Sequence, residues 1–216
     1  MKNKLITELG MDFNRTMLFG FASSFGLGKT TLFSIMAAEY YHDGKNVLFL
    51  TNDMDERIIM KKIRKALKSQ TPNLNVCSLK IKKFITLDET FETELETKSY
   101  DVIIVDGSLV IEDYNLLREL SNKHKCIVIT AIQMNKLSSD TPIDYPIPLK
   151  TNIAQKADML MSLTIKKDFT FWQNMKYLFC FWLKRPNRTI SILKNRYGQD
   201  GTYLDVNVDF DKVKVY

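Results

Sequence analysis

The chain has 216 residues, 45% of them hydrophobic and 26% charged, which is typical of one folded domain covering residues 1–216. No apolar run reaches the roughly 18 residues of a membrane-spanning helix, and no signal-peptide core lies near the start, so we expect no membrane contact. Three cysteines without metal-site or redox spacing favour a reducing compartment, hence a cytoplasmic protein. The net charge of +6 permits a nucleic-acid partner without requiring one.

Short β-branched runs alternate with amphipathic segments through the first two thirds of the chain. The expected strands are 17–22, 46–51, 75–84, 100–106, 126–132 and 159–165, and the expected helices are 31–41, 55–68, 88–97, 112–122 and 152–156. Residues 135–150 are expected to form a long loop. After this loop, short runs broken at residues 185–188 and 198–201 predict antiparallel strands at the sheet edge. The pattern predicts an α/β fold with a mainly parallel sheet flanked by helices.

A phosphate-binding loop is predicted between the first strand and the first helix. Gly28, Lys29 and Thr30 form its Gly-Lys-Thr triplet, whereas the usual first glycine is replaced by Ser23. Lys29 would reach the β- and γ-phosphates and Thr30 would bind Mg²⁺. The residues expected to contact the nucleotide are Ser24, Phe25, Gly26, Leu27, Gly28, Lys29, Thr30 and Thr31. The alternative is a Gly-rich turn that opens an ordinary core helix.

Polar residues at the ends of three further strands complete the candidate site. Asp106 closes a Val-Ile-Ile-Val run and is expected to support Mg²⁺, although it would also suit a turn cap. Asp53 is the leading candidate to position an attacking water; Asp55 and Glu56 compete, with helix capping as their ordinary role. Gln133 would sense the γ-phosphate, or simply end its strand.

These segments resemble the RecA-fold hexameric helicases, meaning bacterial DnaB-type replicative helicases and phage primase-helicases. The likeness continues in residues 152–158 and in residues 194–202, Lys-Asn-Arg-Tyr-Gly-Gln-Asp-Gly-Thr. It implies a RecA-like P-loop NTPase fold that binds ATP and Mg²⁺ between subunits. It also implies that Lys194 and Arg196 reach a neighbouring subunit's γ-phosphate; without it, they would be solvent-facing charges. In the family, the residue at position 53 is a catalytic glutamate, one methylene longer than this aspartate.

The resemblance implies a motor that acts on single-stranded DNA during replication, in a bacterial or phage-infected cell. We expect self-association as a ring or filament, and a replication-protein partner is also possible. The family's primase or primase-binding domain is not expected here. Alternatives are a recombinase-like or regulatory ATPase, or a nucleotide-binding assembly module that hydrolyses little.

Three segments are candidate partner surfaces. Residues 107–113 and 135–150 correspond to the family's DNA-contacting loops. Residues 61–65 are a denser basic cluster, although lysines on a helix face are most often solvated. The aromatic stretch 169–182 is either a core strand or an exposed surface for a protein or for unpaired bases.

Overall fold

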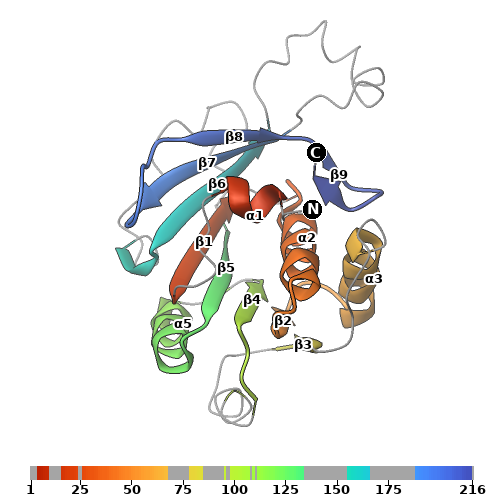
Figure 1. Cartoon of the computed structure of the whole chain (residues 1–216), viewed down its shortest axis with the longest axis horizontal. Coiled ribbons are helices and arrows are strands. Elements are labelled where there is room, and N and C mark those ends of the chain that lie inside the picture. The colour runs from red at the N-terminus through yellow and green to blue at the C-terminus, as the bar shows by residue number, and fades with distance from the viewer. Residues whose placement is uncertain are drawn as a thin grey trace, which may run out of the picture.

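The fold was analysed in a computed structural model of the chain. It describes residues 4–9, 16–23, 26–67, 78–84, 95, 98–107, 109, 111–133, 155–165 and 188–215. A single eight-stranded sheet with the order β3-β2-β4-β5-β1-β6-β7-β8 runs through the molecule (Figure 1). The strands from β3 to β6 are parallel, whereas β7 and β8 are antiparallel to their neighbours.

The strands of this sheet are β1 Met17–Ser23, β2 Val47–Thr51, β3 Leu79–Lys83, β4 Val102–Asp106, β5 Ile127–Gln133, β6 Met159–Ile165, β7 Arg188–Asn195 and β8 Tyr203–Val206. A small antiparallel pair, β9 Val208–Asp209 and β10 Lys214–Val215, follows them. The central strands are buried on both faces, which explains why they read as continuous apolar runs in the sequence.

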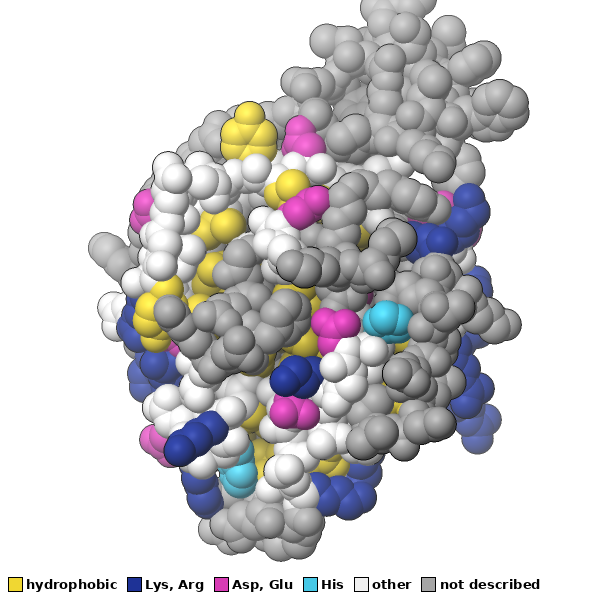
Figure 2. All heavy atoms as spheres, in the orientation of Figure 1, with side chains coloured by type: hydrophobic (Ala, Val, Ile, Leu, Met, Phe, Trp, Pro, Cys, Tyr) yellow, Lys and Arg dark blue, Asp and Glu magenta, His cyan; other side chains and the backbone are white. Residues whose placement is uncertain are grey.

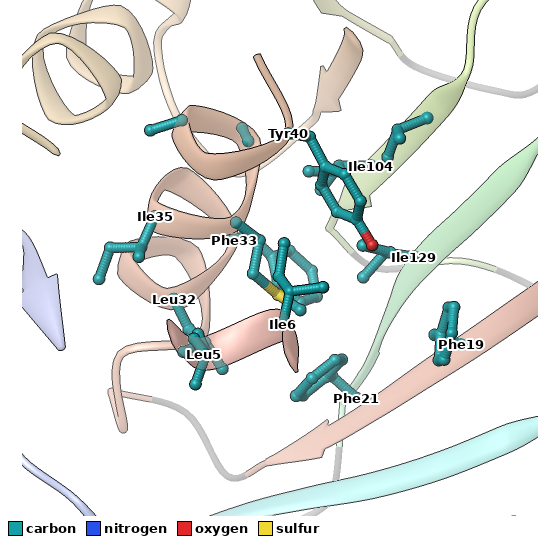
Figure 3. Close-up of a cluster of buried hydrophobic side chains, with 14 of the residues drawn as sticks. Leu5, Ile6, Phe19, Phe21, Leu32, Phe33, Ile35, Tyr40, Ile104 and Ile129 are labelled. Atoms are coloured by element: carbon teal, nitrogen blue, oxygen red, sulfur yellow. The ribbon is translucent and has the colours of Figure 1, made fainter. Parts of the chain in front are cut away.

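The helices are α1 Lys4–Glu8, α2 Lys29–His42, α3 Glu56–Leu67 and α5 Ile111–His124. Alternate residues of each strand enter two separate cores. Phe19 and Phe21 of β1 pack with α1, α2 and α3, whereas Leu18 of the same strand packs with α5 on the other face. Figure 3 shows the first core, in which Tyr40 of α2 points toward β4 and β5.

The predicted sheet, including its antiparallel C-terminal strands, is confirmed. The short helix α1 was not predicted; it buries Leu5 and Ile6 against the first core. The predicted helix 88–97, the loop 135–150 and the aromatic stretch 169–182 lie outside the described residues, apart from Leu95. Among the described helices, none has the length and apolar character needed to cross a bilayer.

Candidate functional site

Four parallel strands bring the predicted site residues to one edge of the sheet. The strands β2, β4, β5 and β1 are consecutive neighbours, so their carboxyl ends lie side by side. Thr51 pairs with Asp106, and Ser23 pairs with Gln133. Because ligands of parallel α/β sheets bind outside these strand ends, this edge is the candidate site.

The loop after β1 has the left-handed turns of a phosphate-binding loop. Gly26 has a φ of 80° and Gly28 a φ of 101°, which glycine adopts without steric cost. Ser23, at the position of the missing glycine, is the last residue of β1 and has no positive φ. A serine is therefore compatible with the backbone there. Ser24 and Phe25 lie outside the described residues.

Helix α2 begins directly after Gly28 and points its N-terminus toward this loop. Leu32 donates its backbone N–H to the Gly28 carbonyl at 3.0 Å, and the Ser34 hydroxyl donates to the Thr30 carbonyl at 2.8 Å. Within the described part of the chain, no side chain caps the N-terminus of α2. The first N–H groups of a helix are available to an anion, and the helix dipole favours negative charge there.

The charges at this edge interact through partly desolvated surroundings. Burial lowers the pKa of Lys29, against the opposing effects of Asp106 and Asp53. Burial also raises the pKa of Asp106 to about 6; Thr30 and Lys29 oppose this shift, whereas Asp53 adds to it. These mutual effects place Lys29, Asp106 and Asp53 within one electrostatic cluster.

Asp106 is the residue that a cation would satisfy. Its side chain is fully buried, and neither carboxylate oxygen has a hydrogen-bond partner of normal geometry among the described residues. A buried carboxylate without a partner costs free energy unless it is protonated or binds a cation. With the Thr30 hydroxyl beside it, this all-oxygen environment suits Mg²⁺, so the residues present fit the ion that the sequence predicts.

Asp53 lies in an exposed bend between β2 and α3. The Met54 N–H donates to the Thr51 hydroxyl at 3.3 Å, which shapes this bend. Its two rivals are engaged elsewhere: Asp55 accepts the Arg57 N–H at 2.7 Å as a helix cap, and Glu56 accepts the Lys83 N–H at 2.6 Å.

The backbone beside Asp106 is also tightly packed. The Asn52 N–H donates to the Asp106 carbonyl at 3.3 Å. A Cβ on Gly107 would lie 1.7 Å from the Asn52 Oδ1 atom, so only glycine fits at that position. This packing holds the ends of β2 and β4 together.

Two residues from the C-terminal part of the chain border the loop and were not predicted. The Arg188 Nε donates to the Leu27 carbonyl at 3.1 Å, and its guanidinium lies 5.1 Å from the centre of the Phe210 ring. That ring is 38% exposed and lies against Gly28. An aromatic face next to a cation is a surface on which a planar base can stack.

A third residue that was not predicted is Lys62 on α3. Its ammonium donates to the Thr31 hydroxyl at 2.9 Å, and its pKa is lowered by burial and by Lys65, with Asp106 opposing. Lys62 lies next to the buried positions Ile59 and Ile63 on the helix, so its side chain is held at the protein surface near α2. That helical spacing was its one signal in the sequence.

Lys194 and Arg196 lie far from the phosphate loop of their own chain. Residues 194 and 195 pair with the first residues of β6, whose neighbour β1 runs parallel to it. Arg196 and the loop are thus at opposite ends of β1, about 20 Å apart along a seven-residue strand. Lys194 donates to the Gln155 and Ala157 carbonyls, and Arg196 to Asp158 and the Gln155 carbonyl.

Gln133 ends β5 beside Ser23, as the register requires. The position of its side chain lies outside the described part of the chain. Its backbone is therefore at the predicted edge, next to the start of the phosphate loop.

A sequence model of the thymidine kinase family matches residues 16–139, more than half of the chain. The matched segment begins just before β1 and ends just after β5, so it contains the phosphate loop, Asp53 and Asp106. No curated protein matches the sequence.

Two solved structures share the fold over almost the entire length. The RadB recombinase is similar with a TM-score of 0.65 and 15% identity, over 98% of this chain and 94% of the recombinase chain. A helicase ATPase domain is similar with a TM-score of 0.68 and 13% identity, over 97% of this chain and 88% of that domain. The predicted RecA-like fold is therefore confirmed, including the part beyond residue 139.

Proposed function

This chain belongs to the thymidine kinase family, and we propose that it is a P-loop ATPase that binds ATP with Mg²⁺. The observation that carries the proposal is the buried, unpartnered carboxylate of Asp106 beside Lys29 and Thr30, at the end of a glycine loop and a helix N-terminus. Phosphate, metal and helix dipole complement one another in such a site.

Each residue at the edge has a proposed task. Lys29 and the backbone N–H groups of residues 24–31 hold the phosphates. Thr30 and Asp106 hold Mg²⁺, which when bound supplies positive charge against the triphosphate. Phe210 and Arg188 offer a stacking surface for the base.

Hydrolysis needs a group that orients the attacking water. Asp53 is proposed for this task, because it is exposed and close enough to influence both Lys29 and Asp106. Gln133 is proposed to contact the γ-phosphate from the adjacent strand end.

The site is proposed to be completed by a neighbouring subunit. Arg196 lies at the wrong end of β1 to reach its own loop, and its side chain is 42% exposed. Offered to a neighbour in a head-to-tail ring or filament, Arg196 and Lys194 would stabilise charge on the transferring phosphoryl group. Such an assembly is proposed to act on single-stranded DNA, as a helicase-type motor in replication or as a recombinase-like or regulatory ATPase.

The second candidate is phosphoryl transfer from ATP to thymidine, favoured by the family match itself. The ATPase is preferred because the likeness to the recombinase and helicase ATPase folds continues through β6 to β8, beyond the matched residues. A third possibility is an assembly module that binds nucleotide with little turnover.

ADP release should be measured with and without single-stranded DNA and with and without thymidine, with the particle mass followed in parallel. We expect thymidine-independent turnover that DNA stimulates. Turnover that requires thymidine and yields its monophosphate would instead establish the kinase, and nucleotide binding without turnover would establish the assembly module.

A mixing experiment tests the shared site. Lys29→Ala removes a subunit's own phosphate contact, and Arg196→Ala removes the group offered to a neighbour. Each variant alone should be nearly inactive, whereas the mixture should recover a fraction of the parental rate. Full activity of Arg196→Ala alone would contradict the shared site.

A further inference from the structure

The positive charge of this protein is concentrated on α3 and β3. Helix α3 has five basic residues and one acidic residue, and β3 has three basic residues in its five positions. These seventeen residues carry a net charge of +7, whereas the whole chain carries +6. The remaining sequence is therefore close to neutral, so the charge marks one surface and not a general property of the chain.

Part of this surface is a groove of about 570 Å³ between α3 and the edge strand β3. Four exposed basic side chains of α3 line it, Arg57, Lys61, Arg64 and Lys65. Glu56 is its acidic member, and its carboxylate already accepts the Lys83 N–H. Figure 2 shows Lys and Arg side chains gathered along the right-hand edge, where α3 lies in Figure 1.

Apolar surface is exposed between these charges. Met60 and Ile81 also line the groove, one from the helix and one from the strand. A groove with cationic walls and an apolar strip suits a ligand that has both anionic groups and flat apolar faces. Nucleotide units have both, and arginine both pairs with phosphates and stacks on bases.

The charge continues around the edge of the sheet. Ile81 faces α3, so strand alternation turns Lys80 and Lys82 toward the other face of β3. The pKa of Lys82 is lowered by partial burial and then by the positive charge of Lys80 and Lys98. A polyanion crossing this edge would relieve that repulsion.

We propose that the α3–β3 groove binds the phosphate backbone of single-stranded nucleic acid. An acidic protein is the less favoured occupant, because lysine is depleted in protein–protein interfaces whereas nucleic-acid interfaces are strongly positive. The proposal deepens the proposed function, since it assigns the DNA contact to the outer helix α3. Residues 107–113 and 135–150 were the segments expected for that contact.

Two hydrogen bonds connect this surface to the nucleotide edge. Lys62 on α3 donates to Thr31 of α2, and Lys65 donates to the Asp211 carbonyl at 3.1 Å, next to Phe210. A strand held on the outer face of α3 is therefore one helix away from the phosphate loop. This connection offers a route by which nucleic acid would influence turnover.

The test is direct binding of a fluorescein-labelled oligothymidylate, followed by anisotropy without nucleotide at about 50 and about 200 mM salt. The groove variant combines Lys61→Gln with Arg64→Gln. The matched control combines Lys123→Gln with Lys125→Gln, two exposed lysines at the end of α5 and just after it. All four positions are exposed, and melting curves check that both variants fold.

We expect the groove variant to bind at least about tenfold more weakly, with a salt slope smaller by about one, while the control stays within about threefold of the parent. A photocrosslinked oligothymidylate should label the α3 peptide. Equal losses in both variants, no binding by the parent, or labelling elsewhere would overturn the proposal. Tighter binding of polyglutamate than of oligothymidylate would establish an acidic polypeptide partner instead. Because no nucleotide is present, a failed ATPase assay leaves this test unaffected.

Discussion

Gly28 and Phe210 are packed so closely that a Cβ atom on Gly28 would lie 2.3 Å from Cε1 of the Phe210 ring. Gly28 also has a φ of 101°, a conformation that other residues rarely adopt. The C-terminal part of the chain therefore closes over the glycine of the phosphate loop. Two independent constraints, one steric and one conformational, require glycine there.

Gly28→Ala should lower both stability and nucleotide affinity. The control is Gly44→Ala, since Gly44 has a φ of 80° but nothing within 4 Å of the added Cβ. We expect the control to cost about 1 kcal/mol from backbone strain, and Gly28→Ala to cost at least about 1 kcal/mol more. Urea unfolding measures both, and fluorescent ATP binding should be lost in Gly28→Ala alone. Equal unfolding costs would show that Phe210 moves away freely.

Asp106→Asn should stabilise the metal-free protein at neutral pH while removing Mg²⁺-dependent nucleotide binding. The pKa of Asp106 is raised by burial to about 6, above the ordinary value of 3.8. Between these values the unfolded chain loses its proton before the folded one, so stability falls as pH rises through this window. The full penalty, about 3 kcal/mol as an upper figure, is present above about pH 6 and absent below about pH 4.

Unfolding free energies of parent and Asp106→Asn, measured with chelator at about pH 4 and about pH 7.5, test this pH dependence. The variant should gain about 1–3 kcal/mol at the higher pH and nothing at the lower. Glu39→Gln is the control, because burial raises the pKa of Glu39 to about 7 far from the phosphate loop. It should stabilise similarly and keep nucleotide binding. A pH-independent gain in Asp106→Asn would contradict the argument.

The strands and the phosphate loop were predictable because their signals are local. Buried parallel strands are continuous β-branched runs, and Asp106 directly ends one of them. Ser23 appeared to break the loop motif, yet it belongs to the extended strand β1, where glycine's freedom has no use. The motif depends on backbone geometry at Gly26 and Gly28, which the sequence keeps.

Phe210, Arg188 and Lys62 were not predictable because their contacts are not local. Arg188 binds the Leu27 carbonyl across 161 positions of the chain, and Lys62 reaches Thr31 across 31. Neither pair leaves a period or a spacing in the sequence. The separation of Arg196 from its own loop likewise appears only once the register of β6 and β7 is known.

Asp53 is expected to act in hydrolysis and not in nucleotide binding. Asp53→Asn should reduce kcat by about 10²–10³-fold with the ATP dissociation constant changed less than about threefold, because the lost group orients water only. Asp53→Glu should retain more turnover than Asp53→Asn. Asp55→Asn is the control, since asparagine keeps the cap that Asp55 provides to α3. Single-turnover and equilibrium binding assays separate the two effects; a similar loss in Asp55→Asn would argue against Asp53.

Asp158 is expected to be the more important of two acidic residues in ion pairs. It is fully buried and accepts hydrogen bonds from the Leu18 N–H, Arg118 and Arg196, with 2.9 Å to the first and 3.2 Å to Arg196. Asp158→Ala leaves Arg118 and a buried N–H without their partner, so we expect a loss of about 3–5 kcal/mol.

Asp209 provides the comparison, because its partner Lys212 is 66% exposed and solvent screens the pair. Asp209→Ala also removes the hydrogen bond from the Lys212 N–H at 2.8 Å, for a total of about 1 kcal/mol. Urea unfolding of both variants measures the difference. Arg196→Ala should cost no more than about 1 kcal/mol, since that side chain is 42% exposed. A large loss of stability in Arg196→Ala would mean that its inactivity reports folding, and the mixing experiment would then need Arg196→Lys in its place.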